Sequence, residues 1–97
     1  MPSYQKKVNA PGQNADSLFN KCEEHIRSFL DKSPIGDYEL TSDSSRRELK
    51  AEAKLFSAHL VCEDESLTLN VKLSLLAAPF KGQLDGAIDR WVQKYIV

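Results

Sequence analysis

The segment Leu67–Leu75 alternates strictly between aliphatic and polar residues, and the apolar spacing changes after Pro79. Side chains of a strand point alternately to its two faces, so the alternation predicts a strand with one apolar face. The spacing that follows is typical of an amphipathic helix. Its apolar residues are Phe80, Leu84, Ala87, Ile88, Trp91, Val92, Tyr95 and Ile96. Pro79 suits the first turn of this helix. We therefore expect the helix to fold back and cover a sheet.

A second amphipathic pattern predicts a helix from about Ala15 to Lys32, with Asn14 or Asp16 as its N-terminal cap. Its apolar stripe consists of Leu18, Cys22, Ile26, Phe29 and Leu30. Alternating residues on either side of this helix predict two further strands. One is a short edge strand at Tyr4–Val8, and the other begins at Tyr38 and ends near Ser42.

The segment from Ser45 to Leu60 fits two structures. Helical spacing relates Leu49, Ala53, Phe56 and Leu60, and the segment is rich in good helix formers. The same segment also alternates over Leu49–Leu55 and Phe56–Cys62, which indicates a hairpin with a turn between the two arms. We favour the hairpin, because the strand at Leu67 needs partners and an isolated strand is marginal in water.

Together these patterns predict an α+β fold in a single domain spanning residues 1–97. The expected architecture is a two-layer sandwich, in which an antiparallel sheet of about three to five strands is covered on one face by both helices. The order of elements would be β-α-β-β-β-β-α. A chain of 97 residues has room for a two-layer core and little else.

The charges are balanced: 13 Lys and Arg against 14 Asp and Glu give a net charge of −1. We therefore expect no surface for nucleic acid and no polybasic patch for a membrane. No apolar run approaches the ~20 residues of a membrane span, and no apolar segment follows the N-terminal lysines as it would in a secretory signal. These features predict a cytoplasmic protein whose Cys22 and Cys62 are reduced, buried thiols.

Ser57 and His59 come closest to a hydrolase pattern, because residues two apart on a strand share one face. A hydrolase also needs an activated nucleophile and an oxyanion hole, and no G-x-S-x-G motif is present. We therefore predict no catalytic residues and no enzymatic activity. Asp85 and Asp89 form an acidic pair on the last helix, and we interpret them as solvated carboxylates near its N-terminus.

Cys22, His25, His59 and Cys62 are residue types that bind zinc. Cys22 and His25 lie one helical turn apart, but His59 and Cys62 would point to opposite faces of a strand. The sequence therefore predicts no metal site and no cofactor.

The segment Val71–Trp91, VKLSLLAAPFKGQLDGAIDRW, resembles the small bacterial polyhydroxyalkanoic acid system proteins. The matching residues are Val71, Leu73, Leu75, Leu76, Pro79, Phe80, Lys81, Gly82, Leu84 and Ile88. The resemblance covers the chain from about Asp37 onward and implies a cytoplasmic protein associated with granules of polyhydroxyalkanoate, a storage polyester. In such a protein Gly82 would let helix and sheet approach closely.

The resemblance favours a non-enzymatic accessory protein that binds the granule surface or its proteins. For such a partner, the candidate surface comprises Lys81, Trp91, Tyr95 and Ile96, although core packing also explains the aromatic residues. One alternative is a START-like module that binds a small hydrophobic ligand, which an open pocket under Trp91 would favour. Another is a homodimer assembled through an exposed strand edge.

Overall fold

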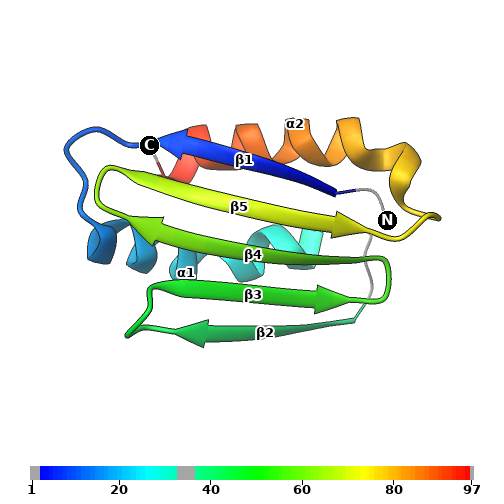
Figure 1. Ribbon diagram of the computed structural model, residues 1–97, viewed down its shortest axis with the longest axis horizontal. Coiled ribbons are helices and arrows are strands. Elements are labelled where there is room, and N and C mark those ends of the chain that lie inside the picture. The colour runs from blue at the N-terminus through cyan, green and yellow to red at the C-terminus, as the bar shows by residue number, and fades with distance from the viewer. Residues whose placement is uncertain (1–2, 33–36, 97) are drawn as a thin grey trace.

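The protein contains a five-stranded antiparallel sheet, which the computed structural model shows within residues 3–32 and 37–96, the part of the chain that it describes. The strand order is β1-β5-β4-β3-β2, so β1 and β2 form the two edges (Figure 1). The strands are β1 (Ser3–Asn9), β2 (Tyr38–Asp43), β3 (Glu48–Ala53), β4 (Phe56–Glu63) and β5 (Ser66–Leu73).

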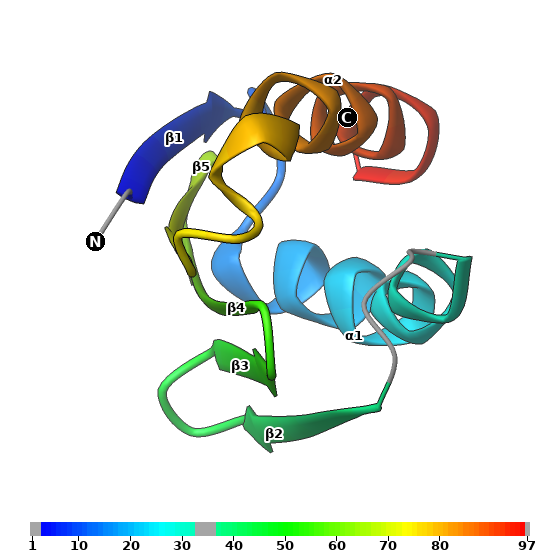
Figure 2. The same ribbon diagram turned by 90° about the vertical axis from the view of Figure 1, so that its right-hand side faces the viewer.

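Both helices lie on the same, concave side of the sheet (Figure 2). Helix α1 (Ala15–Lys32) packs on β4 and β5, and helix α2 (Lys81–Trp91) lies beside it, toward β1. The predicted two-layer α+β architecture and the predicted order of elements are confirmed.

The ambiguous segment forms strands β3 and β4, so the predicted hairpin is confirmed. Leu49 in β3 lies opposite Leu60 in β4, and Leu60 lies opposite Leu69 in β5. All three leucines are buried. Pairing with β5 puts the aliphatic residues of the hairpin on the face that the helices cover, and this tertiary packing outweighs the local helix propensity.

Two polar side chains cap the N-terminus of α1. The Ser17 N–H donates to Asn14 Oδ1 at 2.8 Å. Asn14, the residue just before the helix, is therefore its N-terminal cap, and Asp16, the other expected candidate, is not. The Ala15 N–H donates to Asp64 Oδ1 at 2.9 Å. Asp64 belongs to the turn between β4 and β5, so this bond also attaches the helix to the sheet.

The C-terminal helix has three parts: a 3-10 turn η1 (Ala78–Phe80), helix α2, and a π-helical turn η2 (Val92–Ile96). Pro79 lies in the turn that precedes α2. Two predicted details are wrong. Phe80 is 58% exposed and does not join the buried stripe. Gly82 is exposed, and a Cβ built there would meet nothing within 4 Å, so no close approach to the sheet requires a glycine.

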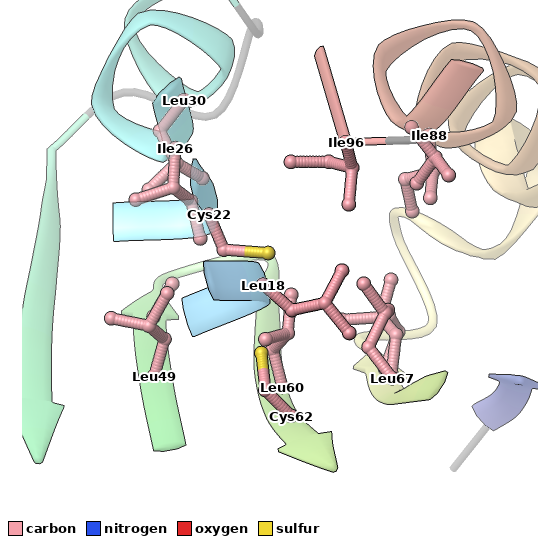
Figure 3. Packing of buried hydrophobic residues seen from close by; sticks show 14 of the residues in the cluster. Leu18, Cys22, Ile26, Leu30, Leu49, Leu60, Cys62, Leu67, Ile88 and Ile96 are labelled. Atoms are coloured by element: carbon pink, nitrogen blue, oxygen red, sulfur yellow. The ribbon is translucent and has the colours of Figure 1, made fainter. Parts of the chain in front are cut away.

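The hydrophobic core lies between the sheet and the two helices (Figure 3). Its most deeply buried large side chains are Leu18, Cys22, Leu49, Leu67, Val71 and Ile96. Both cysteines are buried free thiols, as predicted. A hydrogen bond with Cys62, together with burial, raises the pKa of the Cys22 thiol, so Cys22 stays neutral at physiological pH.

Lys6 joins the first strand to the last helix. Its ammonium group lies 2.6 Å from Asp85 Oδ1 and also contacts the Asp89 carboxylate. Burial alone would lower the pKa of Lys6, but its hydrogen bonds to Asp85 and Asp89 raise it above the ordinary value of 10.5. The two aspartate side chains stay exposed to water, at 46% and 61%, as the interpretation of solvated carboxylates expects, but both also pair with Lys6, which the pairing of β1 with β5 brings close to α2.

Candidate functional site

The loop between β5 and α2 holds the start of the C-terminal helix at one end of the sheet. The Ser74 N–H donates to the Leu55 carbonyl at 2.9 Å, which attaches this loop to the turn between β3 and β4. Beyond Ser74 the chain exposes Leu75 (77%), Leu76 (80%) and Phe80 (58%). We call these three residues the apolar tip.

An open cavity of about 510 Å3 lies next to the apolar tip, between α1, α2 and the adjacent ends of β4 and β5. Its lining is mainly apolar and consists of Phe29, Leu55, Phe56, Leu73, Ala77, Phe80, Leu84 and Ala87, together with Lys32, Gln83 and Arg90. Leu84 and Ala87 of α2 are only partly buried where they line this cavity, whereas Ile88, Val92 and Ile96 are buried in the core.

A smaller cavity of about 40 Å3 lies deeper between the helices and the sheet. Phe29, Phe56 and Leu84 line both cavities, so the two are neighbours. Trp91 and Ile88 line only the smaller one. Together the cavities give the fold an apolar interior that reaches from the apolar tip to Trp91.

Two aromatic contacts connect α1 to the C-terminal helix. The Phe29 and Trp91 rings have centroids 5.6 Å apart, and the His25 ring stacks on Tyr95 at 4.5 Å. Such pairs stabilise a fold beyond the area that they bury. Trp91 Nε1 is buried without a hydrogen-bond acceptor among the residues that the structure describes.

Two cations line the open cavity. Lys32 belongs to the last turn of α1, and Arg90 to the last turn of α2. Both residues are exposed, and no carboxylate occurs among the described residues that line this cavity. The cavity therefore combines an apolar body with positive charge at its solvent-facing side.

The predicted partner surface does not form a single patch. Ile96 is 0% exposed, so it cannot contact a partner on this folded surface, and its inclusion is wrong. Trp91 and Tyr95 are half-buried in their contacts with α1. Lys81 is exposed at the other end of the helix, beside the apolar tip. Core packing accounts for most of the aromatic stripe, and the exposed apolar residues are instead those of the loop before α2.

The other residues considered for chemistry are not assembled into a site. Ser57 and His59 share the outer face of β4, as expected, and His59 Nε2 lies 3.4 Å from Glu48 Oε1. Cys22 and Cys62 lie in the core, on the opposite face of the sheet from His59. Within residues 3–32 and 37–96, no group of three or more His, Cys, Asp or Glu residues is placed to hold a metal ion.

Comparisons with known proteins give the fold and no family. No family model matches the chain, and no curated protein matches it. The resemblance to the polyhydroxyalkanoic acid system proteins therefore stays a prediction. In the described part of the chain, no helix has the length and apolar character needed to cross a membrane.

Three solved structures share the fold. A TBP-like protein from Parabacteroides distasonis ATCC 8503 matches with a TM-score of 0.61 and 12% identity over 71% of this chain. A DUF4468 family protein from Bacteroides ovatus ATCC 8483 matches with a TM-score of 0.57 and 10% identity over 72% of this chain. This chain covers 52% of each of those two proteins. TTHA0849 from Thermus thermophilus matches with a TM-score of 0.56 and 9% identity, over 92% of this chain and 88% of that protein.

Proposed function

We propose that this protein is a non-enzymatic binding module that holds a small apolar molecule between α1, α2 and the sheet. The observation that carries the proposal is the open cavity of about 510 Å3 with its mainly apolar lining. This volume lies within the ~300–1,000 Å3 range of small-molecule sites. The small apolar cavity beside Trp91 adds support, because it extends the same interior toward the aromatic contact with Phe29.

The free energy of binding would come from burying apolar surface. Leu84 and Ala87 are only partly buried, and Phe80 is more than half exposed, although all three line the cavity. A ligand that covered these side chains would remove apolar area from water at about 25 cal/mol per Å2. The sheet and α1 form one wall without needing the ligand, so little ordering of the protein would oppose binding.

A neutral fluorescent probe, N-phenyl-1-naphthylamine, tests this proposal. We expect its emission to increase with saturation on addition of the protein. Ala87→Phe should fill the cavity and abolish the increase, whereas Gln93→Phe, which adds the same ring at an exposed position of η2, should preserve it. Saturable binding that survives Ala87→Phe in a folded protein, or no saturable binding to the unchanged protein, would contradict the proposal.

A second function, association with polyhydroxyalkanoate granules, is favoured by the apolar tip. Exposed aliphatic side chains on adjacent residues, Leu75 and Leu76, are a feature of surfaces that contact an apolar partner. Residues 66–84 contain two lysines and no acidic residue. This segment therefore has no carboxylate that an anionic surface would repel or that an apolar surface would desolvate.

Co-sedimentation with purified granules tests this second function. Replacing Leu75 and Leu76 by serine should remove the protein from the granule pellet, whereas Gln5→Ser with Lys7→Ser, at exposed positions of β1, should leave it there. Equal pelleting of both variants would exclude the apolar tip as the docking site. Assembly through a strand edge stays a separate prediction, which light scattering would test.

A further inference from the structure

We infer that the ligand of the open cavity is a single-chain amphiphile with a carboxylate head, whose chain lies along the apolar lining and whose head lies between Lys32 and Arg90. This inference rests on the proposed binding function and names the class of ligand. It follows from the chemistry of the described residues that line the cavity: of the three polar residues, two are cations and one is an amide, Gln83.

The two cations come from different helices. Lys32 ends α1 and Arg90 belongs to the last turn of α2, yet both line one cavity. Neither forms an ion pair with any residue that the structure describes, although the protein pairs other surface cations, such as Arg47 with Asp16. Two cations on one cavity favour an anionic ligand, because each would attract it.

A carboxylate suits these side chains. The planar guanidinium group of Arg90 can donate two parallel hydrogen bonds to it, and Lys32 can add a charged donor. The Gln83 amide offers a neutral donor on the same side of α2. A cationic head is disfavoured by both charges, and a neutral head could accept hydrogen bonds from the cations but would lack the attraction between opposite charges.

The size and lining of the cavity favour one flexible chain. Its volume of about 510 Å3 is at the small end of the usual range, and its walls are aliphatic or phenyl groups from the sheet and both helices. Phe80 belongs both to the apolar tip and to the cavity lining, so an amphiphile leaving a surface would meet exposed apolar side chains that lead into the cavity.

Decanoic acid and decan-1-ol provide matched probes, because they share a chain length and differ in the head group. We expect isothermal titration calorimetry at pH 7.5 and low salt to show tighter binding of decanoate. The Lys32→Gln/Arg90→Gln variant should weaken decanoate by about tenfold, as expected for charge-assisted bonds at an exposed rim, and leave decanol unchanged. Lys54→Gln/Lys94→Gln removes two cations that do not line the cavity and should change neither affinity.

The outcomes separate the two proposals. If decanol binds and decanoate binds no more tightly, or if the Lys32 and Arg90 substitutions weaken both ligands equally, the carboxylate assignment is overturned while the binding function stands. If neither probe binds and N-phenyl-1-naphthylamine also fails to bind, the binding function itself is overturned. Retained binding of that neutral probe by the double variant would show that the cavity is intact when decanoate affinity falls.

Discussion

The ring of Phe29 in α1 lies 5.6 Å from the ring of Trp91 in the C-terminal helix, with an angle of 53° between their planes. Phe29 lines both cavities, whereas Trp91 lines only the smaller, deeper one. The pair therefore connects the two helices at the point where the open cavity meets the packed core. Three other residues of the C-terminal helix are buried in the core: Ile88, Val92 and Ile96.

Removal of the Phe29 ring should destabilise the fold and enlarge the cavity. Because Phe29 is only partly buried, we expect Phe29→Ala to lower the free energy of unfolding by about 2–3 kcal/mol, somewhat less than for a fully buried phenylalanine. Urea denaturation followed by circular dichroism measures this change. Ser28→Ala, at the adjacent exposed position, should be nearly neutral, and an equal loss in both variants would show that the ring contact contributes nothing.

The Lys6 ion pairs should stabilise the docking of α2 against β1. Lys6→Gln is expected to lower the free energy of unfolding by about 0.5–1 kcal/mol at low salt and by less at high salt. The pKa of Lys6 is raised in the folded protein, so its stabilising contribution is complete below pH 10.5 and is lost as the pH rises through the folded-state value. Lys7→Gln, which changes the exposed neighbour, is the control. A salt-independent loss would contradict the electrostatic explanation.

The two caps of α1 should each contribute measurably to stability. Asn14→Ala and Asp64→Ala each leave a first-turn N–H group without its side-chain acceptor, and each should cost about 1 kcal/mol. Asn20→Ala replaces an exposed asparagine within the same helix and should not destabilise it. Thermal unfolding of the three variants provides the comparison. A neutral Asp64→Ala variant would mean that the turn between β4 and β5 does not hold the helix.

The two thiols should resist alkylation in the native protein. Cys22 is 0% exposed and Cys62 4%, and the raised pKa of Cys22 disfavours its reactive thiolate. Iodoacetamide at pH 8 should modify them on the order of 100-fold more slowly than in urea, because reaction requires opening of the core. Rapid modification of the native chain would show that α1 does not remain packed on β4.

The fold could be predicted largely because its elements carry their own periodicity. The helix predicted from Ala15 to Lys32 has those bounds in the structure, and the alternation after Leu67 corresponds to β5. The hairpin required a tertiary argument, since its composition favours a helix. The argument that β5 needs partner strands predicted the hairpin correctly.

The candidate site could be predicted only in part. Periodicity shows that Phe80 and Leu84 belong to an apolar stripe, but it cannot show that the N-terminal half of α2 leaves this stripe open over the sheet. The contact of Lys6 with Asp85 links residues at opposite ends of the chain, and only the pairing of β1 with β5 brings them together. The sequence around Lys32 and Arg90 does not predict a binding site either, because these two residues line one cavity only after the two helices have packed together.

The most direct test of the binding function is isotope-filtered nuclear Overhauser spectroscopy of the labelled protein with unlabelled decanoic acid or, if it binds, decan-1-ol. Protons of the bound chain should contact the methyl groups of Leu73, Ala77, Leu84 and Ala87, which line the open cavity. Contacts confined to the exposed Leu75 and Leu76, or to Val61 on the outer face of the sheet, would contradict the proposal that the ligand lies between the helices and the sheet.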